Sequence, residues 1–362
     1  MTANNIRLNR REWIMTGASI AMTASITTDS ADASDIGTNG MACPAARTFP
    51  PPTSISEAAQ TFLRQGASQK PPTAPPAPDD AAGWHAYAAE GDKSLPVDMI
   101  LGTPGVALET RQIGGATCHI AIPNGISAAD RRKAHLYIHG GGWVLFGGRA
   151  ALAFAKIPAM QFGGVTYAVD YRMPPDHPFP AGLDDCCAVY AALLQSHAAS
   201  NILVSGSSAG GNLAAALMLK ARDTGLARPA ALVLDTPVTD LTNSGDSWSV
   251  LYGLDPVLRD PEGVGSTKLY LNGRNPRDPY LSPLFGENLA EAFPPTHLRA
   301  GTRDRLLSDT VRMHAALRIA GVPADLYVSE AMPHGGFGGY SPEDAAAIRV
   351  TRKWLGMHWP AT

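Results

Sequence analysis

The stretch Val204-Ser205-Gly206-Ser207-Ser208-Ala209-Gly210-Gly211-Asn212 determines how the rest of this chain is interpreted. An apolar, β-rich segment precedes it and an Ala- and Leu-rich segment follows it, which predicts a buried strand and then a helix. Gly206 and Gly210 bracket Ser208 in a Gly-x-Ser-x-Gly pattern, in which a sharp turn exposes the serine before the positive end of the helix dipole. The pattern predicts a nucleophilic Ser208. A glycine-rich turn with an inert serine is the alternative.

The composition is that of a globular protein with a sizeable core. The chain has 362 residues, 45% hydrophobic and 17% charged, enough for one large domain with a cap or for two domains. A net charge of −3 gives no reason to expect nucleic acid or an anionic membrane as a partner. The four cysteines have neither metal-ligand spacing nor the pattern of a disulfide framework, and Cys186 and Cys187 are expected in a buried helix face.

The first 33 residues differ from the rest. Arg10 and Arg11 precede a mild uncharged run over residues 14–28, and Ala31-Asp32-Ala33 is similar to a cleavage site. We expect residues 1–33 to be a twin-arginine export signal and the protein to be periplasmic or secreted; a cytoplasmic enzyme with a terminal tail is the alternative. The run is too short and too rich in Thr and Ser to predict an integral membrane segment.

Residues 34–105 are expected to form a Pro-rich linker and an N-terminal cap, with an extended stretch at residues 71–78. Short helices are predicted at residues 54–65, with Ser56 as a possible N-cap, and at residues 84–95. Residues 106–362 would then form the catalytic domain. Within it, residues 236–295 are dense in Pro turn signals and are predicted to be an insertion that forms a lid or pocket wall.

Strand-like and helix-like segments alternate along the catalytic domain. This alternation predicts an α/β fold with a mostly parallel sheet and helices on both faces. The predicted strands are 117–122, 134–139, 165–169, 201–205, 231–234, 296–300 and 325–328, and the predicted helices are 149–162, 181–196, 210–224, 308–320 and 342–355.

A second glycine-rich motif follows the strand predicted at residues 134–139. His139-Gly140-Gly141-Gly142 would let backbone N–H groups approach a substrate oxygen without an intervening side chain. A flexible loop or a phosphate cradle are the alternatives. Neither a dinucleotide-binding fingerprint nor a Walker lysine accompanies the motif, so no organic cofactor is implied.

With both glycine motifs, the chain resembles the hormone-sensitive-lipase family of α/β-hydrolases, the bacterial family IV esterases. Residues 170–181 (DYRMPPDHPFPA) and 278–284 (DPYLSPL) are similar to two further segments of that family, and the resemblance covers roughly residues 106–340. It implies the α/β-hydrolase fold. Ser207 departs from the family, which commonly has Asp before the nucleophile.

The order Ser…Asp…His of such enzymes directs the search for the remaining catalytic groups. Asp304 follows a predicted strand and matches the family's acid segment, whereas Asp309 is expected to be a solvated charge on the next helix. His334, in Met332-Pro333-His334-Gly335-Gly336, lies just after the last predicted strand. His139 would hold the glycine loop and would not be the base. The predicted triad is Ser208, Asp304 and His334.

The resemblance implies that the oxyanion is bound by the backbone N–H groups of Gly141, Gly142 and Ala209. Three aromatic residues are candidates for the substrate pocket or, equally, for the core: Trp143, Phe146 and Tyr171.

The sequence therefore predicts a serine carboxylester hydrolase that needs no metal or cofactor and acts on small esters through an acyl-enzyme, with short- to medium-chain acyl groups implied by the resemblance. A lactonase, amidase or deacetylase with the same triad is an alternative. A non-catalytic binding protein of this fold, like the plant gibberellin receptors, is disfavoured because His334 is present. Oligomeric state stays open, with a homodimer as one option.

Overall fold

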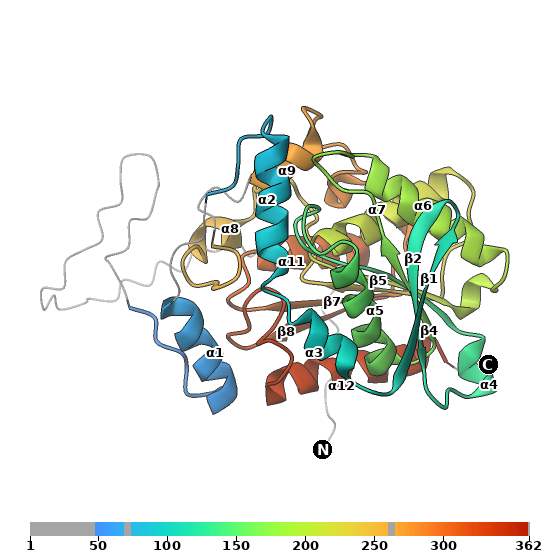
Figure 1. Cartoon of the computed structure of the whole chain (residues 1–362), viewed down its shortest axis with the longest axis horizontal. Helices are drawn as coiled ribbons and strands as arrows, with labels where there is room; N and C mark the ends of the chain where they lie inside the picture. The colour runs from blue at the N-terminus through green and yellow to red at the C-terminus, as the bar shows by residue number, and fades with distance from the viewer. Residues whose placement is uncertain (1–47, 69–73, 260–264, 361–362) are drawn as a thin grey trace, which may run out of the picture. The chain divides into compact units, whose positions relative to one another are not determined.

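An eight-stranded sheet in the order β1-β2-β4-β3-β5-β6-β7-β8 carries the site (Figure 1). The computed structural model describes residues 48–68, 74–259 and 265–360, and the elements below belong to one compact unit, Pro50–Thr362. The predicted export signal, residues 1–33, lies outside the described residues. The strands are β1 Val106–Ile113, β2 Ala116–Pro123, β3 Ala134–Ile138, β4 Val165–Asp170, β5 Ile202–Ser207, β6 Ala231–Asp235, β7 Thr296–Gly301 and β8 Ala324–Ser329.

From β4 to β8 neighbouring strands are parallel, while β1 and β2 are antiparallel to their neighbours. The central strands are apolar on both sides because helices cover both faces. In β6, Leu232 and Leu234 face one core, and Ala231 and Val233 face another. This confirms the predicted α/β class and the mostly parallel sheet.

Helices α6, α7 and α11 cover one face of the sheet, and α5 and α12 cover the other. The α-helices are α1 Glu57–Ser68, α2 Ala81–Asp92, α3 Val97–Gly102, α4 Ala128–Arg131, α5 Arg149–Phe162, α6 Ala181–Leu194, α7 Ala209–Asp223, α8 Asp246–Val250, α9 Gly265–Leu271, α10 Leu289–Ala292, α11 Leu307–Ile319 and α12 Pro342–His358. Among the described residues, no helix is both long enough and apolar enough to cross a membrane.

Strand β1 is absent from the prediction. It is an edge strand whose side chains are mostly exposed or half-buried, so it lacks the apolar run of a central strand. A two-residue turn, Gly114-Gly115, joins it to β2, and both glycines have positive φ. Such a turn is the usual signal of a tight hairpin, and it could have revealed β1.

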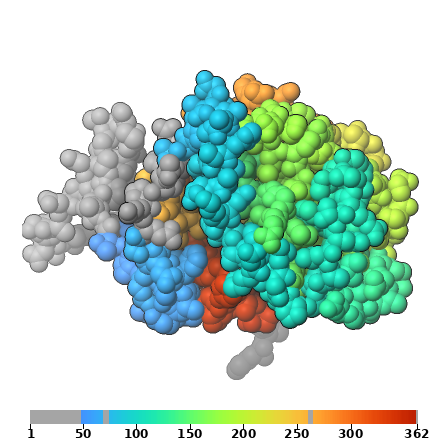
Figure 2. Space-filling model, in the orientation of Figure 1, coloured from blue at the N-terminus to red at the C-terminus, as the bar shows by residue number. Residues whose placement is uncertain are grey.

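The segment before β1 packs over loops that follow strands β3, β7 and β8. Helix α1 places Ala59 and Leu63 in a cluster with Met332 and Phe337, and Ser56 donates through its backbone N–H and its hydroxyl to Glu343 of α12. Ser56 also accepts the Ala59 N–H, which makes it the cap of α1. In Figure 2 the blue surface of α1 adjoins the red C-terminal segment.

Helix α2 lies beside α9 of the segment between β6 and β7 (Figure 1). Trp84 of α2 is fully buried, in a cluster with Val144 and Leu269. The described residues between β6 and β7 include α8, α9, α10 and the 3-10 turn Pro283–Phe285. Two parts of the chain that are far apart in sequence therefore meet over the carboxyl ends of the strands.

Candidate active site

Ser208 occupies a strained turn between β5 and α7. Its φ is 55° and its ψ −120°, a conformation that costs a residue with a side chain about 1–3 kcal/mol. The turn is possible because Gly206 and Gly210, two positions before and after Ser208, lack side chains. A Cβ on Gly206 would lie 2.1 Å from the Gly210 carbonyl oxygen, and one on Gly210 would lie 2.1 Å from that of Ile138. The pattern of glycines around Ser208 therefore brings the start of α7 directly against the end of β3.

The structure brings Ser208, His334 and Asp304 together in one hydrogen-bonded line. Ser208 Oγ is 2.8 Å from His334 Nε2, and His334 Nδ1 is 3.1 Å from Asp304 Oδ1. An ionised carboxylate can only accept, so Nδ1 carries the proton and Nε2 is left to accept from the serine hydroxyl. His334 and Asp304 are both buried, at 6% and 0% exposure. This arrangement can remove the Ser208 proton as the oxygen attacks a carbonyl.

The loop that bears Asp304 is held from two directions. Asp304 Oδ1 also accepts the Leu306 N–H at 2.9 Å, which fixes the carboxylate relative to its own backbone. From the segment between β6 and β7, the buried Asp255 accepts the Arg305 N–H at 3.1 Å. A residue of the segment between β6 and β7 thus supports the backbone next to Asp304, the predicted catalytic acid.

The prediction that Asp309 is a solvated charge is wrong. Asp309 is 4% exposed, and one of its oxygens accepts the N–H groups of Thr239, at 2.7 Å, and Asp240, at 2.9 Å. Its position in α11 faces the turn after β6, a contact that the helical pattern alone does not show. Burial raises the pKa of Asp309 to about 7.

The charges around His334 set its proton affinity. Burial alone would lower its pKa, because an imidazolium is poorly solvated in the interior. The charge of Asp304, the hydrogen bond to Asp304 and the charges of Asp255 and Asp235 act in the opposite direction and outweigh burial, so the pKa of His334 is raised. The protonated form of His334 is therefore stabilised by its surroundings.

Residues 139–148, here called the oxyanion loop, run from the end of β3 to the start of α5. Its first residue, His139, is buried, and burial lowers the pKa of its imidazole to about 4. The Tyr171 ring stacks on His139 at 4.4 Å, and the Tyr171 hydroxyl donates to the His139 carbonyl oxygen at 3.1 Å. Tyr171 is therefore a buried support of the oxyanion loop.

The oxyanion loop passes close to Ser208. A Cβ on Gly140 would lie 3.2 Å from Ser208 Cβ, so this glycine allows the close approach. Ala209 is the first residue of α7, where a backbone N–H has no partner within its helix. In the oxyanion loop, Gly141 and Gly142 come directly after Gly140, and both have positive φ. The three predicted oxyanion donors thus belong to two backbone segments that converge beside Ser208.

The oxyanion loop also contains two bulky residues with positive φ, Trp143 at 63° and Phe146 at 74°. Each conformation costs about 1–3 kcal/mol and persists only where neighbours enforce it. The Trp143 indole is buried and stacks on Tyr270 of α9, with centroids 4.5 Å apart and ring planes 4° apart. The Phe146 N–H donates to Asp92 Oδ1 of α2 at 2.7 Å. Of the predicted pocket residues, Trp143 and Tyr171 are packed in the core, whereas Phe146 is half-buried.

The polar residues near the oxyanion loop form supporting contacts. Asp170 accepts the Gly148 N–H at 3.0 Å and lies 3.3 Å from the buried His119, and Arg172 pairs with Asp185. Three cysteines are described, Cys118, Cys186 and Cys187, and all are free thiols. Within the described part of the chain, no three His, Cys, Asp or Glu side chains are arranged to hold a metal ion.

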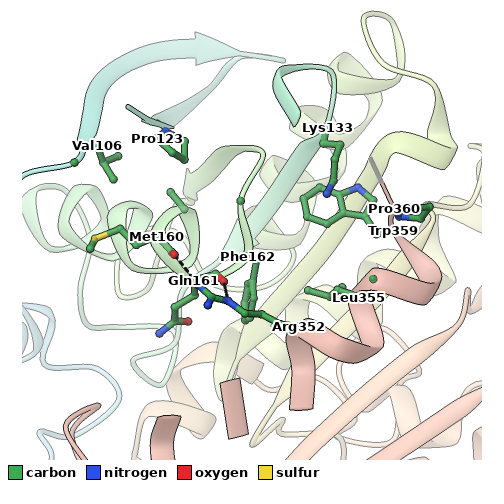
Figure 3. Close-up of a pocket in the computed structure, with 14 residues that line it drawn as sticks. Val106, Pro123, Lys133, Met160, Gln161, Phe162, Arg352, Leu355, Trp359 and Pro360 are labelled. Atoms are coloured by element: carbon green, nitrogen blue, oxygen red, sulfur yellow. Dashed lines mark hydrogen bonds between the residues drawn. The ribbon is translucent and has the colours of Figure 1, made fainter. Parts of the chain in front are cut away.

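A cavity of about 730 Å³, drawn in Figure 3, has a lining that does not include Ser208. Its lining comes from the start of β1, the residues before β3 and the ends of α5 and α12, which is the edge of the sheet where the parallel strands begin. Lys133 lies over the Trp359 ring at 3.9 Å, and Arg352 donates to the carbonyl oxygens of Met160 and Gln161. The charged groups of Lys133 and Arg352 are therefore engaged by other protein groups. Because Ser208, Asp304 and His334 do not line this cavity, it is not the candidate active site.

Comparison with known families shows which fold family the chain belongs to. The profile of the family described as "alpha/beta hydrolase fold" matches residues 135–337, which include the oxyanion loop, Ser208, Asp304 and His334. The chain belongs to the α/β-hydrolase fold family. An esterase of the bacterial hormone-sensitive-lipase family aligns in three dimensions with this hydrolase at a TM-score of 0.70 and 28% identity, covering 84% of this chain and 99% of that one. This confirms the resemblance on which the prediction rested.

Other relatives of this hydrolase are also named as esterases. A second solved esterase has a TM-score of 0.76 and 33% identity, covering 87% of this chain and 98% of its own. The "Acetyl-hydrolase" of Streptomyces hygroscopicus is 32% identical over 189 residues, 52% of this chain and 62% of its own length. The "Esterase LipI" of Mycobacterium tuberculosis is 29% identical over 271 residues, 72% of this chain and 80% of its own length. This hydrolase thus aligns with less than two thirds of the acetyl-hydrolase.

Three residues that support the site were missed from the sequence: Asp92, Asp255 and Tyr270. Each contacts a catalytic loop from a distant segment. Asp255-Pro256 is one of the turn signals in residues 236–295, and Asp92 falls in the helix predicted at residues 84–95, so neither position predicts a partner. No local pattern identifies such contacts.

Proposed function

We propose that this hydrolase is a carboxylesterase that works through an acyl-enzyme on Ser208. The observation that carries the proposal is the hydrogen-bonded line from Ser208 through His334 to Asp304, at 2.8 and 3.1 Å. Ester hydrolysis requires a nucleophile, a base and donors for the developing oxyanion, and candidates for all three lie together around the turn at Ser208.

In the proposed reaction, Ser208 Oγ bonds to the ester carbonyl carbon while its proton passes to His334 Nε2. The N–H groups of Gly141, Gly142 and Ala209 stabilise the oxyanion. His334 then gives the proton to the departing alcohol oxygen as the carbon–oxygen bond breaks. A water molecule attacks the acyl carbon, its proton passes to His334 and then to Ser208 Oγ, and the carboxylic acid leaves.

Short- to medium-chain acyl groups are the substrates we propose. Two observations support this class: relatives named acetyl-hydrolases, and the solved structure of a relative, 27% identical, that was soaked with p-nitrophenyl butyrate. A series of p-nitrophenyl esters from acetate to palmitate tests the class. Lactones and anilides assayed beside it test the alternative activities, which would be favoured if either were cleaved faster than the best ester.

The test of the nucleophile is Ser208→Ala together with fluorophosphonate labelling. We expect the variant to lose a factor of about 10⁴ or more in kcat and to take up no label, while Ser207→Ala keeps both. Full activity in Ser208→Ala, or label on another serine, would overturn the assignment.

We also propose that the protein is exported, on the strength of the paired arginines at positions 10 and 11 and the Ala31-Asp32-Ala33 motif. Amino-terminal sequencing of the protein recovered from the periplasm and medium tests this. Active enzyme that stays in the cytoplasm with residues 1–33 intact would contradict it.

A further inference from the structure

Several residues of the oxyanion loop have positive φ, a conformation that is unfavourable for those with a side chain, Trp143 and Phe146. Gly141, Gly142, Trp143 and Phe146 all have positive φ. For Phe146, with a bulky side chain, this region is a genuine outlier that the surroundings must enforce. A hydrogen bond to its backbone N–H is one such constraint, and the structure shows which side chain supplies it.

Asp92 is the last residue of α2, and its carboxylate accepts the Phe146 N–H at 2.7 Å. The carboxylate is partly buried, which raises its pKa, while the bond from Phe146 opposes that shift. The end of α2 also touches the loop directly, since a Cβ on Gly91 would lie 2.9 Å from Leu145 Cδ2. Helix α2 therefore contacts the loop in two ways: Gly91 packs against Leu145, and the Asp92 carboxylate accepts the Phe146 N–H.

A movement of Phe146 would reach the proposed oxyanion donors. The loop folds back on itself, because the N–H groups of Val144 and Leu145 both donate to the Gly141 carbonyl oxygen. A Cβ on Gly141 would lie 2.8 Å from Phe146 Cδ2 and 2.6 Å from the Leu145 carbonyl oxygen. Gly141 and Phe146 thus pack against each other without space between them.

We propose that Asp92 is a positioning residue for the oxyanion loop: by holding the Phe146 N–H, it keeps the Gly141 and Gly142 N–H groups aimed at the oxyanion. This inference rests on the proposed function, since it assigns a role in that reaction to the cap. Under this proposal α2 contributes to catalysis by positioning the oxyanion loop, in addition to any role in enclosing the substrate.

The test compares Asp92→Ala, Asp92→Asn and Asp98→Ala in the full-length protein. Asp98 is a matched control: it also reaches from the N-terminal segment to the core, but its partner is the Arg149 side chain at the exposed surface, at 2.8 Å. The measurements are kcat and KM on p-nitrophenyl butyrate and Ki for a trifluoromethyl ketone, which becomes an oxyanion when Ser208 adds to it. Thermal unfolding shows whether each variant is folded at the assay temperature. Fluorophosphonate titration counts the sites whose Ser208 is reactive.

For Asp92→Ala we expect kcat per titrated site to fall by about 10- to 100-fold, the effect of a misplacement of about 1 Å, with Ki rising by the same factor and KM changing less. Asp92→Asn keeps an acceptor oxygen and is expected to retain most activity; Asp98→Ala is expected to match the wild type. A loss of folding alone would lower the number of titrated sites and leave kcat per site unchanged.

The inference is overturned if Asp92→Ala keeps wild-type kcat and Ki per site, or if Asp92→Asn is as impaired as Asp92→Ala. Hydrogen exchange of the peptide 139–148 gives a readout that does not need ester hydrolysis: protection should fall in Asp92→Ala and persist in Asp98→Ala. Unchanged exchange would also overturn it. A wild type that neither cleaves esters nor takes up label at Ser208 would refute the proposed function separately.

Discussion

The rings of Trp143 and Tyr270 lie face to face, 4.5 Å apart and within 4° of parallel. Trp143 belongs to the oxyanion loop, and Tyr270 belongs to α9 in the segment between β6 and β7. The stack therefore holds a strained loop residue in place from that segment. Asp92 does the same for Phe146 from the N-terminal side. The oxyanion loop is thus fixed by two segments that are remote in sequence from each other.

Removing the ring of Tyr270 should therefore affect both stability and rate. For Tyr270→Ala we expect a loss of about 3–5 kcal/mol in the free energy of unfolding and a lower kcat, because Trp143 loses its stacking partner. Tyr270→Phe keeps the ring and removes a buried hydroxyl that has no partner among the described residues. It should stay within about 1 kcal/mol of the wild type. Urea unfolding and steady-state kinetics check both, and equal effects of the two substitutions would contradict the role of the stack.

The raised pKa of His334 predicts the acidic limb of the pH–rate profile. The base must be neutral, so kcat/KM should rise with pH through the pKa of His334, with its midpoint above the ordinary 6.5. The same shift stabilises the folded state below about pH 6.5, and this stabilisation is lost as pH rises through the folded pKa.

Asp255→Asn tests the cause of that shift. Removing one nearby negative charge should move the midpoint to lower pH, whereas Asp246→Asn, an exposed carboxylate of the same segment, should leave it in place. The measurement is kcat/KM between pH 5 and 9 with p-nitrophenyl butyrate. A midpoint that moves equally in both variants, or in neither, would count against the electrostatic explanation.

Gly210 and Gly356 offer a matched pair of glycine substitutions. In Gly210→Ala the new Cβ would lie 2.1 Å from the Ile138 carbonyl oxygen and 2.4 Å from that of His139, so α7 must shift and Ser208 with it. We expect activity to fall by about 10²-fold or more. Gly356, inside α12, has nothing within 4 Å of its added Cβ. Gly356→Ala should add about 0.5–1 kcal/mol of stability at unchanged kcat. Thermal unfolding and active-site titration separate the outcomes; an active Gly210→Ala would show that the close approach is dispensable.

Buried Asp309 predicts a pH dependence of stability. Its pKa is about 7 in the folded state against an ordinary value of 3.8, so the folded protein retains a proton that the unfolded chain releases. Stability should therefore fall as pH rises from about 4 to about 7, by at most about 4 kcal/mol. Asp309→Asn keeps an acceptor for the Thr239 and Asp240 N–H groups and should lack this dependence. Urea unfolding of both proteins at several pH values checks the slope, and parallel slopes would refute the prediction.

Much of the site could be predicted because it depends on local chemistry. The turn at Ser208 needs glycines at fixed offsets, and the predicted acid and base follow strands whose apolar runs are visible in sequence. Strand order then brings the carboxyl ends of β5, β7 and β8 to one edge. Each of these features can be predicted from residues close together in the sequence and from the order of the segments along the chain.

The remaining features depend on contacts between distant segments. Asp92 and Phe146 are 54 positions apart, and Asp255 and Arg305 are 50 apart. Whether Asp309 is solvated depends on which turn α11 packs against. An aspartate in a helix or turn looks the same in sequence whether water or a backbone N–H meets it, so these roles became visible only in three dimensions.

The contact between Ser56 and Glu343 constrains the order in which the protein can be completed during synthesis. Helix α1 packs on residues 331–337, and its cap residue Ser56 bonds to Glu343, 287 positions further along the chain. When α1 leaves the ribosome, none of its partners has been made. Helix α1 can therefore make these contacts only after Glu343 has been synthesised, when all eight strands of the described sheet have already been made.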